Sequence, residues 1–161
     1  MNRLILGLGT NLGDKNSNLE EAIKQIESEI GRLKKKSSVY ETQAWGVENQ
    51  DNYYNMAVEI ETRFWPFKVL KMILAIEEKM GRIRSQKWES RIIDIDILFF
   101  NEISISSENL TIPHPYIQKR RFVLEPVCEI TPDYLHPKFR ETVAKLLQDC
   151  TDESWIERIT S

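Results

Sequence analysis

Asp94 and Asp96 stand one residue apart inside the most strand-like apolar run of the chain. Because side chains alternate between the two faces of a strand, the isoleucines around them would enter a core while both carboxylates project from the opposite face. Two adjacent carboxylates repel each other, and a hard divalent cation with oxygen ligands relieves that repulsion. Mg²⁺ is often held by one or two carboxylates together with substrate phosphates. The pair therefore indicates a magnesium site for phosphoryl transfer or, more simply, the solvated face of an amphipathic strand.

A cationic segment, Gly81 to Arg91, directly precedes this strand. It includes Trp88 and has neither helical nor strand periodicity. Its basic residues are Arg82, Arg84, Lys87 and Arg91. Arginine matches phosphate oxygens with paired hydrogen bonds, so a cationic loop that ends at a metal-binding strand has the groups needed to hold a polyphosphate. Charged runs are often only solvated surface, and the position beside the aspartates is what favours nucleoside triphosphate chemistry.

Length, composition and charge limit the classes of protein to which this chain can belong. With 161 residues, of which 41% are hydrophobic, the chain is expected to form a single domain over residues 1–161. A net charge of −3 and a pI near 5.5 argue against nucleic acid as a partner. The apolar stretch from Leu4 to Leu8 is too short for a signal peptide or a membrane span, so we expect a cytoplasmic protein without a membrane partner. Cys128 and Cys150 lack metal-ligand spacing and are expected to be free thiols.

Four strands and two helices are expected to position these residues. The expected strands run from Arg3 to Leu8, Leu33 to Thr42, Asn55 to Thr62 and Ile92 to Phe100. One helix follows the capping signature Ser17-x-x-Glu20 and stops at Gly31, and a second has Pro66 in its first turn and ends at Gly81. The apolar stripe of the second helix is Val69, Leu70, Ile73, Leu74 and Met80. The β-α-β-β-α-β order predicts an α+β fold with a ferredoxin-like core.

Additional elements are expected after this core. Residues Glu102 to Thr111 suit a short hairpin or ribbon, and the prolines of Ile112 to Pro115 keep that segment extended. Two further helices, around Phe122 to Glu129 and Thr142 to Gln148, would cover the sheet. The tail from Thr151 is expected to be loosely ordered.

Several single residues allow two interpretations. Glu77 falls on the apolar stripe of the second helix, so it is either buried with an arginine partner, which we favour, or faces the site. His114 lies between two prolines near three basic residues, where it is either structural or a phosphate donor. Tyr53 and Asn55 at a loop-strand junction suit either the core or a flat heterocycle. The turn from Gly9 to Asp14 lacks P-loop spacing and is interpreted as lining a site.

A set of motifs occurs in one order along the chain. The motifs are Gly9-Thr10-Asn11-Leu12-Gly13-Asp14, Tyr40-Glu41-Thr42, Asn55, Ile76-Glu77-x-x-x-Gly81-Arg82-x-Arg84, Trp88-x-x-Arg91-x-Ile93-Asp94-Ile95-Asp96, Ile112-Pro113-His114-Pro115 and Arg120-x-Phe122-Val123-Leu124-x-Pro126. Together they resemble the 6-hydroxymethyl-7,8-dihydropterin pyrophosphokinases of folate biosynthesis, over roughly Leu4 to Pro137. The resemblance implies a ferredoxin-like fold and transfer of pyrophosphate from ATP to the pterin hydroxymethyl group, with release of AMP.

The resemblance also implies a role for each matching residue. Asp94 and Asp96 would hold two Mg²⁺ ions that bridge the ATP phosphates and the substrate hydroxyl. The implied pterin pocket is Thr42, Tyr53, Asn55, Trp88 and Phe122. The implied catalytic residues are Arg82, Arg91 and Asp96. The implied ATP-binding residues are Arg84, Arg91, Ile97, Thr111, His114 and Arg120. Either Asp96 or a metal-bound alkoxide would take the hydroxyl proton. The expected partners are ATP, as co-substrate, and the pterin, bound by a monomer.

The chain departs from the family pattern at three places. Trp88-Glu89-Ser90-Arg91 stands where Trp-Gly-Pro-Arg is usual, and Lys87 stands where arginine is frequent. Gln43-Ala44-Trp45-Gly46 replaces a proline-containing stretch, which gives Trp45 a possible pterin contact. We expect the segments Glu48 to Asn52 and Gly81 to Ile92 to close over the substrates.

Two other functions are compatible with paired aspartates or a ferredoxin-like core. A nucleotidyltransferase would use the same carboxylates with two metal ions, but the pterin-type Asn55 and the aromatic set argue against it. A nucleic-acid-binding module without enzymatic activity would need stacking aromatics and positive charge on the sheet rather than Asp94 and Asp96.

Overall fold

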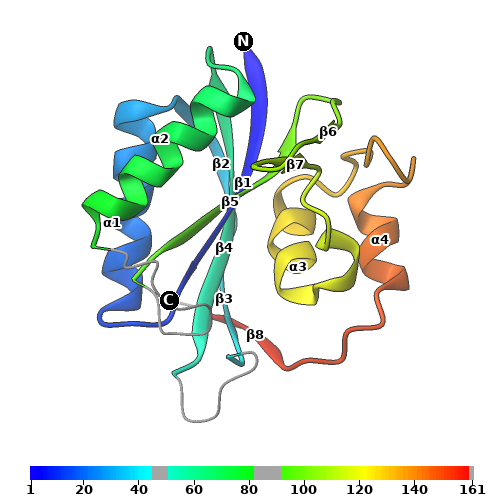
Figure 1. The fold of residues 1–161 in the computed structure, drawn as a ribbon. Coiled ribbons are helices and arrows are strands. Elements are labelled where there is room, and N and C mark those ends of the chain that lie inside the picture. The colour runs from blue at the N-terminus through cyan, green and yellow to red at the C-terminus, as the bar shows by residue number, and fades with distance from the viewer. Residues whose placement is uncertain (45–50, 82–91, 160–161) are drawn as a thin grey trace.

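The computed structural model describes residues 1–44, 51–81 and 92–159, and its centre is one antiparallel sheet (Figure 1). The strands of this sheet are β1 (Asn2–Thr10), β2 (Arg32–Lys36), β3 (Val39–Thr42), β4 (Tyr53–Thr62), β5 (Asp94–Phe100) and β8 (Ile156–Ile159). Their order is β5-β1-β4-β3-β8, and β2 also pairs with β4. Strand β1 therefore lies between β4 and β5, and β5 lies at one edge of this sheet.

Helices cover both faces of the sheet, which gives three layers (Figure 1). On one face lie α1 (Lys15–Glu29) and α2 (Pro66–Lys79), and on the other lie α3 (Arg121–Ile130) and α4 (Val143–Asp149). A two-stranded ribbon of β6 (Ile105–Ser106) and β7 (Thr111–Ile112), followed by the 3₁₀ turn η1 (Ile117–Lys119), connects β5 to α3. Among the described residues, no helix is both long enough and apolar enough to cross a membrane.

Two hydrophobic clusters, one on each face, explain why the strands are apolar almost throughout. Leu4 and Leu6 of β1 pack in the cluster under α1 and α2, whereas Ile5 packs in the cluster under α3 and α4. This alternation buries both faces of β1, because successive side chains of a strand point to opposite sides. The expected mixed α and β architecture is confirmed, and both cysteines are free.

Two expected boundaries were wrong. Helix α1 is capped by Asp14, whose Oδ1 accepts the Ser17 N–H at 3.1 Å, so it begins earlier than the Ser17 signature predicts. The expected strand from Leu33 to Thr42 is two strands, because Ser37 interrupts the ladder. Its hydroxyl, rather than its carbonyl oxygen, accepts the Ala57 N–H at 2.9 Å.

The stripe of α2 and the C-terminal tail also differ from expectation. Leu74 is 40% exposed, and Ile76 is buried instead. The tail contains strand β8, which pairs with β3 at the sheet edge. Arg158 of this strand donates from Nε to Ser38 Oγ at 2.9 Å and lies 3.8 Å from Glu129 Oε2 of α3. These contacts hold a segment whose local sequence gives little indication of order.

The turn after α1 requires a glycine, and we predict that Gly31→Ala destabilises the fold by about 3 kcal/mol. A Cβ at Gly31 would lie 2.2 Å from the Glu61 carbonyl oxygen, which is backbone and cannot rotate away. Urea unfolding measures the effect. Gly13→Ala is the comparison, because its loss comes from the left-handed φ of +71° alone, with no atom within 4 Å of the added Cβ, and we expect that loss to be smaller. The prediction is wrong if the two variants lose equal stability.

Candidate active site

The two aspartates of β5 project from the face opposite their isoleucine neighbours, as the alternation predicts. Ile93, Ile95 and Ile97 are at most 5% exposed and belong to the cluster under α1 and α2, whereas Asp94 and Asp96 are partly exposed on the other face. The register places Asp94 opposite Gly9 and Asp96 opposite Gly7 of β1. Because both paired residues are glycines, no side chain of β1 lies next to either carboxylate on this face of the sheet.

Glu77 of α2 supports the segment that carries the aspartates. Its side chain is 1% exposed, and Oε2 accepts the backbone N–H of Ile95 at 2.8 Å. Because β5 is the edge strand next to β1, this N–H needs an acceptor outside the sheet ladder. Glu77 is therefore buried and binds the backbone between the two aspartates, and the arginine partner that we favoured for it stays a prediction.

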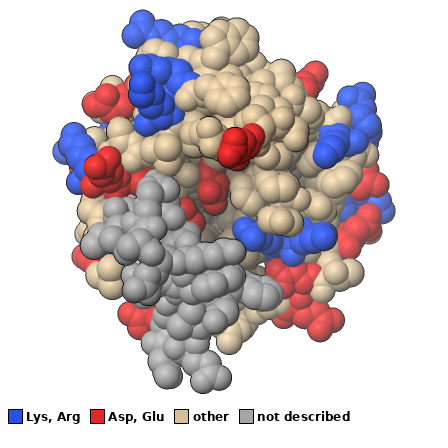
Figure 2. Space-filling view, viewed as in Figure 1, with Lys and Arg blue, Asp and Glu red and all other residues tan. Residues whose placement is uncertain are grey.

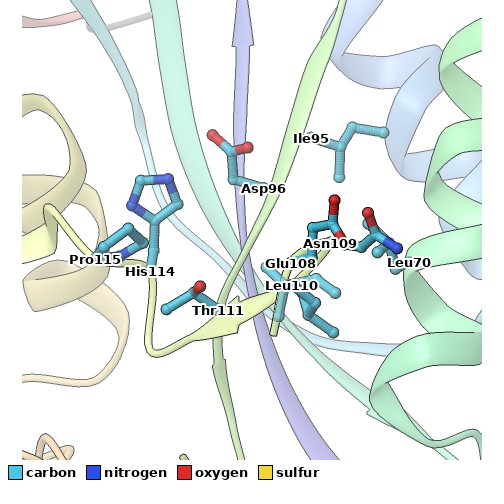
Figure 3. A pocket seen from close by; sticks show the side chains of 10 residues that line it. Leu70, Ile95, Asp96, Glu108, Asn109, Leu110, Thr111, His114 and Pro115 are labelled. Carbon is cyan, nitrogen blue, oxygen red and sulfur yellow. The ribbon is translucent and has the colours of Figure 1, made fainter. Parts of the chain in front are cut away.

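A cavity of about 270 Å³ opens next to Asp96, between β5, the β6–β7 ribbon and α2 (Figure 3). Its lining residues are Leu70, Ile95, Asp96, Ile97, Glu108, Asn109, Leu110, Thr111, His114 and Pro115. Leu70, Ile95, Ile97, Leu110 and Pro115 supply apolar surface, and Asp96, Glu108, Asn109, Thr111 and His114 supply polar groups. A cavity that combines apolar surface with polar groups suits a flat ring attached to a charged group.

His114 is held as a neutral side chain. Its Nδ1 accepts the Tyr116 N–H at 3.4 Å, and its backbone N–H donates to the Leu98 carbonyl at 3.1 Å. Burial, together with the Arg120 charge, lowers the pKa of His114 to about 4, although Asp94 acts in the opposite direction. With Nδ1 as an acceptor, the ring hydrogen of the neutral form lies on Nε2. The ring can therefore donate one hydrogen bond to an anion at neutral pH.

The lowered pKa of His114 predicts a loss of stability in acid. An unfolded histidine takes up a proton below about pH 6.5, whereas folded His114 resists protonation down to about pH 4. The contribution is complete above pH 6.5 and is lost as the pH falls toward 4. Between pH 7 and 5 we expect this group to cost about 2 kcal/mol of unfolding free energy. Urea unfolding of wild type and His114→Gln at both pH values measures it, and equal losses in the two proteins would contradict the assignment.

Arg120 and the aromatic rings near it lie at the start of α3. The guanidinium carbon lies 5.1 Å from the centre of the Tyr116 ring and 5.8 Å from that of Phe122. These distances fit cation–π contacts, which orient the side chain. Arg120 thus places a positive charge near His114, and this charge helps to lower the His114 pKa.

A second polar group lies on the other side of β1. Asn55 of β4 is 8% exposed, and its Nδ2 donates to Thr42 Oγ1 of β3 at 2.7 Å. Asn55 pairs with Gly9, which in turn pairs with Asp94, so the three residues form one row across the sheet. With about 4.8 Å between neighbouring strands, Asn55 and Asp94 are separated by about 10 Å, with only glycine between them.

The loop before Asn55 is anchored to the turn after β1. Asn11 is fully buried and donates from Nδ2 to the Asp51 carbonyl at 3.2 Å, and Lys15 donates to the Asn52 carbonyl at 3.0 Å. The interpretation that the Gly9 to Asp14 turn lines a site is compatible with these contacts. Tyr53, which follows directly, pairs with Thr42 and is half-buried.

The structure places the predicted residues in two groups. Asp96, Ile97, Thr111 and His114 meet at the cavity, and Thr42 and Asn55 meet across β3 and β4. Leu70, Glu108 and Asn109 also line the cavity and were missed, because they belong to no motif and come from α2 and the ribbon turn. The predicted residues that fall outside the described part of the chain are Trp45, Arg82, Arg84, Lys87, Trp88 and Arg91, with the segments 45–50 and 82–91 that contain them.

The pair Asp94 and Asp96 fits a magnesium ion that is shared with a substrate. Among residues 1–44, 51–81 and 92–159, no cluster of three or more His, Cys, Asp or Glu side chains is arranged to hold a metal ion. Two carboxylates on one strand suit Mg²⁺, which keeps several waters and takes its other ligands from phosphates. The donor set thus favours metal binding together with a polyphosphate.

Comparison with known proteins gives consistent matches. Residues 5–132 match the family model described as 7,8-dihydro-6-hydroxymethylpterin-pyrophosphokinase. The chain is 40% identical over 162 residues to the 2-amino-4-hydroxy-6-hydroxymethyldihydropteridine pyrophosphokinase of Methylorubrum extorquens, covering 99% of each chain. It is 38% identical over 151 residues to the enzyme of the same name from Aquifex aeolicus, covering 94% of each.

A solved structure shares the fold. Wild-type HPPK-DHPS of Plasmodium falciparum with SDX-DHP is similar with a TM-score of 0.75 and 22% identity, over 92% of this chain and 43% of that one. At this identity the likeness concerns the fold alone.

Proposed function

The chain belongs to the 7,8-dihydro-6-hydroxymethylpterin-pyrophosphokinase family, and from this premise we propose which residues carry each part of its reaction. It is an ATP-dependent diphosphokinase that transfers pyrophosphate to the hydroxymethyl group of 6-hydroxymethyl-7,8-dihydropterin in folate biosynthesis. One observation supports the assignment most strongly. The two carboxylates of β5 lie between the cavity and the Thr42–Asn55 pair, as a reaction between two bound substrates requires.

The cavity beside β5 is proposed as the ATP site. The apolar side chains of Leu70 and Leu110 would contact the adenine ring, and Thr111 would bind the adenosine. The neutral His114 ring would donate from Nε2 to a phosphate oxygen, and Arg120 would add positive charge. From their sequence positions, the arginines at 82, 84 and 91 are proposed to bind the phosphates as well.

Asp94 and Asp96 are proposed to hold two Mg²⁺ ions. When bound, these ions would neutralise the charge of the triphosphate and polarise its phosphoryl oxygens. The protein's own contribution is the spacing of the two carboxylates, which the β5 backbone and its bond to Glu77 fix. This division agrees with phosphoryl transfer in general, which depends mainly on positioning and charge neutralisation.

The Thr42–Asn55 pair is proposed to bind the pterin. Asn55 offers an amide oxygen and its second amide hydrogen to the edge of the ring, because the first hydrogen is bound to Thr42. Tyr53, Phe122 and Trp88 are proposed to stack on the ring faces. About 10 Å separates Asn55 from Asp94, so a pterin read at one edge by Asn55 would present its opposite end to the carboxylates.

The proposed reaction proceeds in line. The pterin hydroxyl oxygen forms a bond to the β-phosphorus of ATP, while the bond from that phosphorus to the oxygen it shares with the α-phosphorus breaks. Asp96 accepts the hydroxyl proton, and AMP leaves with the negative charge of the broken bond. His114 and the arginines stabilise the charge that develops on the phosphate oxygens.

The finer description of the molecule is also a proposal. The strand order β5-β1-β4, with β2 and β3 beyond β4, supports a ferredoxin-like core. We propose that residues 1–161 form one pyrophosphokinase domain that works as a monomer. Acidic and basic side chains are interspersed over the described residues on the face in Figure 2, which offers no continuous basic surface there for a nucleic-acid backbone.

The direct test is the release of AMP from ATP in the presence of Mg²⁺ and 6-hydroxymethyl-7,8-dihydropterin. We expect AMP only when the pterin is present, and no AMP from Asp96→Ala. Asp149→Ala is the control, because Asp149 is an exposed carboxylate paired with Lys145 on α4. Release of pyrophosphate instead of AMP would favour the nucleotidyltransferase, and intact ATP would favour the binding module.

A further inference from the structure

We propose that Gly9 is a specificity-determining residue, because the absence of a side chain at this position sets the orientation of the Asn55 carboxamide. The inference rests on the proposed function of Asn55 as the group that recognises the pterin. It adds that the shape of β1, and not Asn55 alone, selects the substrate.

The first observation is the close approach of Asn55 to Gly9. The two residues pair across β1 and β4. A Cβ at Gly9 would lie 2.8 Å from Asn55 Oδ1 and 3.7 Å from Tyr53 Cδ1. The first distance is shorter than a carbon and an oxygen tolerate, so any other residue at position 9 would displace the amide oxygen.

The second observation is that Asn55 has little freedom to move. Its side chain is 8% exposed, and its Nδ2 is bound to Thr42 Oγ1 at 2.7 Å. Thr42 is itself 4% exposed. A displaced Oδ1 would turn the amide about its χ2 torsion, which would lengthen the bond to Thr42. Gly9 therefore leaves room for the oxygen of this carboxamide, and Thr42 binds its nitrogen.

The orientation of this amide carries the specificity. An asparagine presents an acceptor on one side and a donor on the other, so a rotated amide presents a different pattern to the ligand. The substrate class it fits is a flat heterocycle whose edge has a donor beside an acceptor. A site built around such hydrogen bonds discriminates strongly, because a mismatch leaves buried polar groups without partners.

The position of Gly9 between Asn55 and Asp94 makes the same residue part of the floor of the site. The row Asn55, Gly9, Asp94 crosses three neighbouring strands. A pterin that spans this row would lie over Gly9, where a methyl group would occupy the space of the ring. The cavity beside β5 does not include Gly9, so ATP binding is not affected by this change.

The test compares Gly9→Ala with Gly7→Ala. Gly7 lies on the same strand and the same face, but the three atoms nearest to its added Cβ all belong to the Leu98 side chain, with Cδ1 the nearest at 3.3 Å. That atom ends a flexible side chain. The first measurement is the ¹⁵N-edited NMR signal of the Asn55 side-chain amide without ligand, identified by its absence in Asn55→Asp. The second is calorimetric titration with 6-hydroxymethyl-7,8-dihydropterin and, separately, with a non-hydrolysable ATP analogue and Mg²⁺.

Gly9→Ala is expected to shift the Asn55 amide signals and to raise the pterin Kd at least tenfold, with the Kd of the ATP analogue within twofold of wild type. Gly7→Ala should leave the Asn55 signals in place. Unshifted amide signals in Gly9→Ala, or an unchanged pterin Kd, would overturn the inference. If wild type neither binds the pterin nor releases AMP in its presence, the proposed function fails, and the inference about substrate selection fails with it. Shifted amide signals would then still show that Gly9 orients Asn55.

A second variant covers the case in which Gly9→Ala does not fold. The double variant Gly9→Ala with Asn55→Ser removes the oxygen that the new Cβ would meet. Recovery of the folded state in the double variant would show that the conflict is with Asn55, as proposed. A double variant that also fails to fold would locate the conflict elsewhere and overturn the inference.

Discussion

Asp96→Asn is expected to lower the turnover of the Mg²⁺-dependent reaction by about 1000-fold. The substitution keeps the shape of the side chain but removes the charge that would bind metal and accept the hydroxyl proton. Asp96 lines the cavity together with His114 (Figure 3). The substitution therefore removes a charge next to the proposed phosphate site, and turnover should fall for that reason. The measurement is the rate of AMP release at saturating ATP and pterin.

Asp94→Asn and Asp149→Asn define how this result is interpreted. Asp94 shares the exposed face of β5, so its variant should also lose most of its turnover and should need more Mg²⁺ for half-maximal rate. Asp149 pairs with Lys145 at 3.3 Å on the surface of α4, and its variant should match wild type. Urea unfolding must show that all three variants fold. More than a tenth of wild-type turnover in Asp96→Asn would remove Asp96 from the reaction.

The orientation of the two aspartates could be predicted because it depends on local sequence alone. Alternation in the segment from Ile93 to Ile97 determines which side chains share a face, whichever strands the segment pairs with. For the same reason the existence of α1 and α2 followed from helical spacing.

The row from Asn55 through Gly9 to Asp94 could not be predicted in this way. It depends on the register of β1 against both β4 and β5, and those partners lie more than 40 residues away along the chain. Register is determined by packing of whole strands and not by a signature in one of them. The family resemblance implied Asn55 and Asp94 as site residues, but not the bare glycine between them.

Side-chain contacts with distant backbone were missed for a related reason. Ser37 divides the expected second strand because its hydroxyl accepts the Ala57 N–H, 20 positions away. Strand β8 is ordered because the edge of β3 and the Glu129 carboxylate are available to it. Such contacts leave no local pattern, since either partner alone is an ordinary polar residue.

Glu77 gives the second large effect, and Glu77→Leu is expected to reduce both stability and turnover. The leucine fills most of the volume but leaves the Ile95 N–H without the acceptor that now lies 2.8 Å away. An unsatisfied buried N–H costs about 1–3 kcal/mol, which we expect to measure by urea unfolding. Turnover should fall about 100-fold, because a shift of about 1 Å in reacting groups has an effect of that size.

Glu77→Gln separates the hydrogen bond from the charge. The glutamine oxygen can accept the Ile95 N–H, so this variant should keep more stability than Glu77→Leu and should keep the spacing of Asp94 and Asp96. If Glu77 acts by positioning the aspartates, the leucine variant will also require more Mg²⁺ for half-maximal rate, and the glutamine variant will not. Equal Mg²⁺ requirements in both variants would mean that Glu77 contributes to the fold alone, because a purely structural loss lowers the amount of folded enzyme without changing the metal affinity of the molecules that remain folded.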